Sequence, residues 1–208
     1  MELSPAASKG LLTLAGVGAA GGGLAGGAYL LKKTDTIQDH IKSLNLELIS
    51  SLETSKVSAQ WEAEFNLDKE SIKASISSID SWEKLKNWCS ESLKAKSEGN
   101  GDLISKVRKW CVLGTIEEKL ARKKGIEFVS DTDTQGWEKI YTDNSVEADR
   151  EAIGLNKTKN DSQNKDSDKQ KIKDFCNTKK TEKFLAETKT TSADRVEKWC
   201  TKTSNQAG

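Results

Sequence analysis

The sequence has little proline and histidine, and no excess of charge of either sign. Pro5 is the only proline, so no later residue has the fixed φ and the missing N–H that interrupt a helix. The 33 basic and 32 acidic residues of this 208-residue chain nearly cancel, which argues against a nucleic-acid partner. Lys, Glu, Ala, Leu and Ser are abundant and favour helices. We therefore expect an all-α fold.

Local motifs of catalytic sites are also missing. There is no H-E-x-x-H, no P-loop and no G-x-S-x-G, and the single histidine, His40, cannot fill several catalytic roles. The segment Gly16–Gly21 matches the dinucleotide fingerprint G-x-G-x-x-G, but no alternation of strands and helices follows it. No C-x-x-C pair suggests a zinc site. We expect no enzyme activity, no cofactor and no metal.

One uncharged segment stands near the start of the chain. Gly10 to Leu31 is a run of 22 residues between Lys9 and Lys32-Lys33, long enough to cross a bilayer. A cleaved signal peptide is the main alternative, but no Ala-x-Ala site ends the run. We expect residues 1–9 to be a short tail and residues 10–31 to be a Gly/Ala-rich transmembrane anchor in contact with the lipid bilayer.

Glycines within this segment recur every four residues, at Gly18, Gly22 and Gly26. Small residues at that spacing let two membrane helices approach closely. The pattern suggests a weak homodimer formed through the anchor.

Each of the four cysteines directly follows an aromatic residue. The four dipeptides are Trp88-Cys89, Trp110-Cys111, Phe175-Cys176 and Trp199-Cys200. Their contexts agree in pairs, since Leu85 and Ile172 each precede a cysteine by four residues, and Val107 and Val196 do the same. The chain therefore contains a diverged duplication. Trp137 opens the second copy and corresponds to Trp61 in the first.

Helical periodicity divides the rest of the chain into two repeats. Repeat 1 spans residues 34–125 and begins with an amphipathic lead helix, followed by one helix from about Asp68 to Gly99 and another from Asp102 to near Gly125. The stripe of the lead helix consists of Ile37, Ile41, Leu44, Leu48 and Leu52. Repeat 2 spans residues 126–208 and contains an insert near residues 156–171, whose polar composition predicts disorder.

The spacing of the cysteines favours one disulfide in each repeat. Cys89 and Cys111 are each eleven residues from Asn100, and Cys176 and Cys200 are each twelve from Thr188. In an antiparallel hairpin each pair then lies at one height, where facing Cα atoms are about 4–5 Å apart. Reduced core cysteines are the alternative, and four cysteines allow three pairings.

Two signals disagree about the side of the membrane that the body occupies. Lys32-Lys33 after the anchor, against Lys9 before it, points to a cytoplasmic body by the positive-inside rule. An even number of patterned cysteines in a polar body with a thin core favours an oxidising exterior. We expect a single-pass protein of the cell membrane with an extracellular body.

The organisation resembles that of a known group of proteins. A Gly/Ala-rich segment ending in Lys32-Lys33, followed by a polar body with Trp-Cys dipeptides such as the one in Val107-Arg108-Lys109-Trp110-Cys111, resembles the large paralogous families of uncharacterised surface-type proteins of haemotropic mycoplasmas. The resemblance implies a wall-less bacterium whose membrane faces the host directly. It implies no catalytic residue.

These observations lead to one expected function and one alternative. The expected function is a helical surface protein displayed for host interaction or antigenic variation, with host surface molecules or antibodies as partners. The alternative is a cytoplasm-facing structural or scaffolding membrane protein with reduced cysteines.

Overall fold

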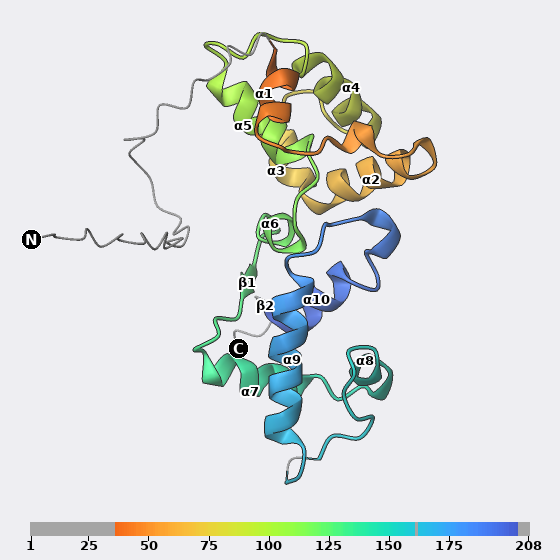
Figure 1. Cartoon of the computed structure of the whole chain (residues 1–208), viewed down its shortest axis with the longest axis vertical. Helices are drawn as coiled ribbons and strands as arrows, with labels where there is room; N and C mark the ends of the chain where they lie inside the picture. Colours follow the sequence, from red (N-terminus) through yellow and green to blue (C-terminus); the bar gives the residue numbers. More distant parts are fainter. Residues whose placement is uncertain (1–35, 161, 204–208) are drawn as a thin grey trace, which may run out of the picture. The chain divides into compact units, whose positions relative to one another are not determined.

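Helices dominate the part of the chain that the structure, a computed structural model, describes, which is residues 36–160 and 162–203 (Figure 1). The first helices are α1 (Ile37–Ser43), η1 (Ile49–Ser51), α2 (Thr54–Leu67), α3 (Lys69–Ser75), α4 (Trp82–Ser92), α5 (Gly101–Trp110) and α6 (Ile116–Leu120). The later ones are α7 (Thr134–Asp143), α8 (Glu147–Glu151), α9 (Lys165–Lys179), η2 (Ala186–Thr188) and α10 (Ala193–Cys200).

The expected helical class is confirmed, with one small sheet in addition. Strands β1 (Ile126–Phe128) and β2 (Thr201–Thr203) pair antiparallel, with Glu127 opposite Lys202. The expected tail at residues 1–9 and the expected anchor at residues 10–31 lie outside the described residues. Within the described ranges, no helix is both long and apolar enough to span a membrane.

Buried apolar side chains form two separate cores, one for each repeat. The first core ends in sequence at Leu113 and the second begins at Ile116. The sequence placed the boundary between the repeats at residues 125–126, ten residues later. Helix α6 belongs to the second core because its apolar face, Ile116 and Leu120, packs there.

The duplication extends further than the cysteine motifs indicated, because equivalent backbone hydrogen bonds close both repeats. The donor and acceptor pairs are Ile37 to Ala95, Gln38 to Leu93 and Ile49 to Cys111 in the first repeat, and Ile116 to Glu182, Glu117 to Lys180 and Val129 to Cys200 in the second. Each helix that opens a repeat also has a threonine N-cap, Thr36 or Thr115, whose hydroxyl accepts a backbone N–H. Thus α1 and α6 are equivalent elements.

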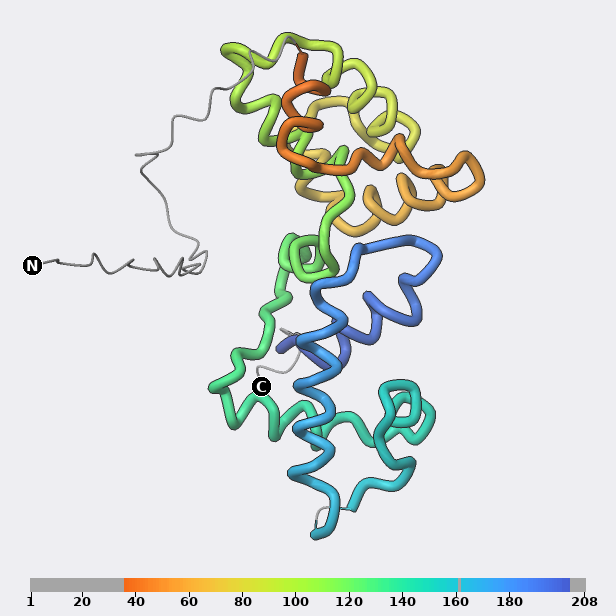
Figure 2. Tube along the Cα trace, viewed as in Figure 1, coloured from red at the N-terminus to blue at the C-terminus, as the bar shows by residue number. Residues whose placement is uncertain are grey.

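The expected lead helix is much shorter than its apolar stripe. Helix α1 ends at Ser43, Asn45 has a positive φ of 55°, and Figure 2 shows the trace continuing without helical turns before η1. Leu44 is exposed, whereas Leu48 forms an isolated β-bridge with Val112. The left-handed turn at Asn45 ends the helix, and pairing with the segment after Cys111 replaces it.

The next two expected helices are also divided. The chain leaves helical geometry between α3 and α4, where Ser78 has a φ of 77°, and α4 restarts at Trp82 behind the N-cap Ser81. Helix α5 ends at Trp110, so α6 is a separate element rather than its continuation. Helix α2, which has a weak amphipathic pattern, was not expected.

The insert near residues 156–171 is partly helical, which corrects the expectation of disorder. Helix α9 begins at Lys165, within the insert. Asp168 in that part of α9 is fully buried and pairs with the buried Arg150 of α8 at 2.5 Å. Lys169 pairs with Glu138 of α7. These charged contacts attach a segment that has no apolar residues for a core.

Candidate functional site at the junction of the repeats

Each repeat contains one disulfide, in the pairing that the sequence favoured. Cys89 is bonded to Cys111 with a Cα separation of 5.7 Å, and Cys176 is bonded to Cys200 with a Cα separation of 5.6 Å. The bonds join α4 to the end of α5 and α9 to α10, and Figure 1 shows α9 beside α10. All four cysteines are buried in the two cores. Each loop closure contributes about 3 kcal/mol in the chain-entropy model.

The aromatic residue before the second cysteine of the first repeat has a polar partner. The indole N–H of Trp110 donates to the buried Asp68 carboxylate at 2.8 Å, and the Lys109 ammonium lies 3.0 Å from the same carboxylate. Although burial raises the pKa of Asp68, hydrogen bonds from Ser71, Trp110 and Lys109 hold it below its ordinary value. The site fixes the end of α5 against the start of α3.

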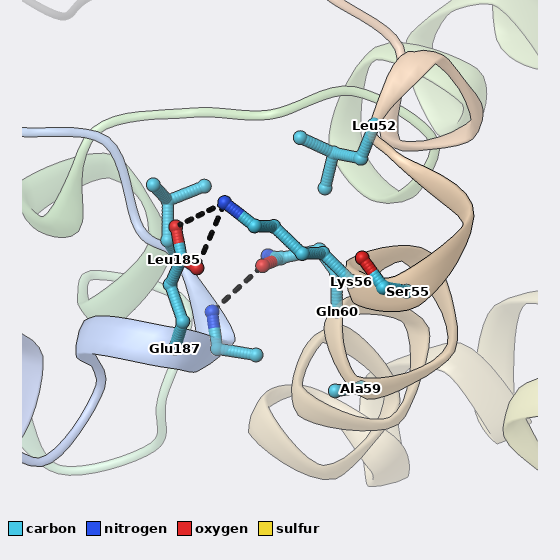
Figure 3. A pocket seen from close by; sticks show the side chains of 8 residues that line it. Leu52, Ser55, Lys56, Ala59, Gln60, Leu185 and Glu187 are labelled. Carbon is cyan, nitrogen blue, oxygen red and sulfur yellow. Dashed lines mark hydrogen bonds and ion pairs between the residues drawn. The ribbon is translucent and has the colours of Figure 1, made fainter.

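The two repeats meet where η2 of the second lies against α2 of the first. A pocket of about 170 Å³ opens between them. Figure 3 shows it between α2 and the segment around η2, with Lys56 reaching toward Glu187. Its lining residues are Leu52, Ser55, Lys56, Ala59, Gln60, Leu185, Ala186 and Glu187.

One side chain of α2 binds the backbone of the second repeat on both sides of Leu185. The amide Nε2 of Gln60 donates to Phe184 O at 3.0 Å, and its Oε1 accepts the N–H of Ala186 at 2.7 Å. Gln60 is 1% exposed, so both bonds are sheltered from water. Beside it, the exposed Lys56 and Glu187 form an ion pair at 3.1 Å.

A buried cluster of charges joins the repeats a short distance away. The Lys119 ammonium of α6 lies 2.7 Å and 2.8 Å from the two carboxylate oxygens of Glu64 in α2, and it donates to Val112 O at 2.8 Å. Arg122 approaches the same carboxylate at 2.9 Å and also donates to Lys109 O. Burial lowers the pKa of Lys119, while Glu64 acts in the opposite direction.

A second hollow, of about 470 Å³, opens beside the first, since Ala59 and Ala186 line both. Its wall includes Glu62, Lys123 and Glu197, of which the last two form an ion pair. The junction is therefore lined by small apolar residues and rimmed by charges. The side-chain amide of Gln60 is already hydrogen-bonded within the protein. A ligand at this junction would therefore be recognised by its shape and its charge.

Sequence reasoning located the cysteines but missed the residues of the junction. Glu64 and Lys119 are 55 residues apart, and Gln60 is 124 residues from Phe184. No local spacing identifies such pairs; the only available signal was a glutamine and a glutamate on the otherwise apolar face of α2. The glycines Gly18, Gly22 and Gly26 lie outside the described residues.

The described residues contain no group of three or more His, Cys, Asp or Glu side chains arranged to hold a metal ion. Their buried carboxylates instead accept hydrogen bonds from lysine, arginine and tryptophan side chains. Comparison of the chain with protein-family models, curated proteins and solved structures finds no match.

Proposed function

We propose that this chain is a membrane-anchored protein whose helical body is displayed outside the cell for host contact or antigenic variation. The observation that carries the proposal is the pair of buried disulfides, one in each repeat. Such bonds persist in oxidising compartments and are rare where cellular thiols keep cysteines reduced. The uncharged run at residues 10–31 supports attachment to a membrane.

The composition of the body fits this role. Exposed polar side chains cover two small cores that disulfides stabilise, so surface residues can change with little effect on folding. The resemblance to surface-type families of haemotropic mycoplasmas supports the same location. No catalytic residue is part of the proposal.

A single engineered thiol tests the location. Ser77 is exposed between α3 and α4, and the described part of the chain has no free cysteine, so S77C adds one reactive thiol to the full chain. We expect a membrane-impermeant maleimide to label S77C on intact cells without reductant. The unsubstituted chain is the control and should stay unlabelled on intact cells.

The same experiment identifies the alternative. If S77C reacts only after lysis, and the native cysteines then react after denaturation without reductant, the body faces the cytoplasm with reduced thiols. That result would contradict display and favour the scaffolding role.

Host contact needs a separate measurement. Fab fragments raised against residues 36–203 should bind intact cells and reduce their attachment to host cells, whereas Fab fragments against an internal protein should do neither. Binding of the Fab without any loss of attachment would leave antigenic display as the role of the body and exclude adhesion.

A further inference from the structure

A third cleft lies where α5 of the first repeat meets α6 of the second, and its charge differs from that of the other two. Its volume is about 320 Å³, at the lower end of the range of small-molecule sites. The lining residues are Leu46, Ser105, Arg108, Lys109, Val112, Leu113, Gly114, Glu118 and Arg122. Three of them are cationic and one is acidic.

The acidic side chain is already engaged. Glu118 Oε2 accepts the N–H of Thr115 at 2.8 Å in the capping box of α6. Lys109 is likewise paired with Asp68, so its charge is largely compensated. Arg122 is paired with Glu64 through one nitrogen only, and Arg108 has no ion pair among the described residues, so these two guanidinium groups are the cations with donors to offer a ligand.

The two arginines carry unused hydrogen-bond donors. Arg122 has a side chain only 15% exposed, and its one engaged nitrogen, Nη1, contacts Glu64 and Lys109 O. Its Nε and Nη2, and the whole guanidinium of Arg108, have no acceptor among the residues that the structure describes. A guanidinium presents five N–H groups in a planar fork that matches the oxygens of phosphate or sulfate.

The backbone adds a further donor. Gly114 lines the cleft, and its N–H has no acceptor within residues 36–160 and 162–203. A Cβ at this position would lie 2.9 Å from Glu118 Oε2, so a side chain here would disturb the capping box. Glycine at this position therefore keeps the capping box intact.

The ionisable side chains that line the cleft are mostly cationic. They are Arg108, Lys109, Arg122 and Glu118. Asp68 pairs with Lys109 and Glu64 pairs with Arg122, whereas Arg108 has no ion pair among the described residues. An anionic group in the cleft would supply that partner.

We propose that this cleft binds a phosphate or sulfate monoester carried on a sugar-sized group, through Arg108, Arg122 and the N–H of Gly114. The cleft is larger than a lone tetrahedral anion requires, which leaves room for the attached group. The proposal goes beyond display at the cell surface and does not depend on it, because the site needs only the folded body.

Titration of the purified full chain with glucose 6-phosphate, glucose 6-sulfate and uncharged glucose, in buffer without phosphate, tests this site. We expect saturable binding of at least one of the two esters, no binding of glucose, and a shift of the Gly114 amide resonance on titration. The ester that binds more tightly identifies the anionic group. Equal binding of glucose, no saturable binding of either ester, or an unshifted Gly114 amide would overturn the proposal.

Charge-matched variants of α5 separate the site from general electrostatics. R108Q should weaken binding at least tenfold, whereas K106Q, which removes the same charge from the same helix outside the cleft, should change it less than twofold. R108K keeps the charge without the planar fork and should give an intermediate affinity. Equal weakening by R108Q and K106Q, in variants with unchanged circular dichroism, would contradict the assignment. None of these outcomes bears on the thiol-labelling test.

Discussion

At the scale of single residues, Lys119 joins the two repeats most directly. Its ammonium is fully buried, and the two Glu64 oxygens and Val112 O surround it. Removal of a charge from water is costly, and the acceptors offset that cost only while all of them are present. The cluster therefore favours one arrangement of α6 on α2, because any shift would leave a buried charge without its partner.

A double-mutant cycle measures this coupling. K119M should destabilise the protein by about 3 to 5 kcal/mol, because Glu64 is left buried with Arg122 as its remaining partner. E64Q together with K119M should cost less than the sum of the two single changes. Urea unfolding of the four proteins gives the energies. Additive effects would show that the two side chains act independently.

Asp68 gives a prediction for acid stability. Its folded pKa is lowered from 3.8, so its hydrogen-bonded carboxylate stabilises the fold fully above that value and progressively less as pH falls through the folded pKa. D68N should cost about 1 to 3 kcal/mol at pH 7 and should flatten the loss of stability below about pH 4.

The control for D68N is D102N, which removes an exposed carboxylate whose partner is Lys106. Its stability at pH 7 should change by less than about 1 kcal/mol. The measurement is the urea midpoint between pH 3 and pH 7. A D68N curve parallel to that of the unsubstituted chain would mean that Asp68 does not contribute to the acid transition.

At the scale of elements, the sequence predicted helices correctly where the helical spacing of apolar residues and the residues that end helices indicate the same bounds. Both hairpins turn between their cysteines, as the spacing about Asn100 and Thr188 predicted. The apolar stripe from Ile37 to Leu52 predicted too long a helix, because its spacing continues past Asn45, where the backbone leaves helical geometry. Periodicity records which residues are apolar, but the β-bridge of Leu48 depends on Val112, some sixty residues later.

The break between α3 and α4 gives a prediction at this scale. Ser78 is exposed and has a φ of 77°, a conformation that costs a side chain roughly 1 kcal/mol and glycine almost nothing. S78G should therefore stabilise the protein by about 0.5 to 1 kcal/mol in urea unfolding. S77G, at an exposed neighbour without a positive φ, should destabilise slightly or have no effect. Destabilisation by S78G would show that the turn is not strained.

At the scale of the whole molecule, two cores of similar construction are joined by polar contacts. The cores themselves follow from the sequence, since the tryptophans and cysteines of both repeats belong to them. The junction does not, because its hydrogen bonds link Gln60 and Glu64 to residues far along the chain. From the sequence alone, Gln60 and Glu64 of α2 are expected at the surface. They are buried because the second repeat covers them.

This construction predicts that the junction controls how cooperatively the repeats unfold. Gln60 makes two hydrogen bonds to the segment Phe184–Ala186, and Q60A leaves a buried carbonyl and a partly buried N–H without partners. We expect a loss of about 2 kcal/mol and a separation of unfolding into two steps, in which amides of α9 and α10 exchange before those of α4 and α5.

The matched control is Q135A on α7, where the exposed glutamine stands one residue from the position equivalent to Gln60. Hydrogen exchange of the two variants and the unsubstituted chain compares the repeats directly. If Q60A lowers protection equally in both repeats, the cores unfold as one cooperative unit and the contacts of Lys119 alone are sufficient to couple them. If only the second repeat loses protection, the amide of Gln60 transmits stability from the first repeat to the second.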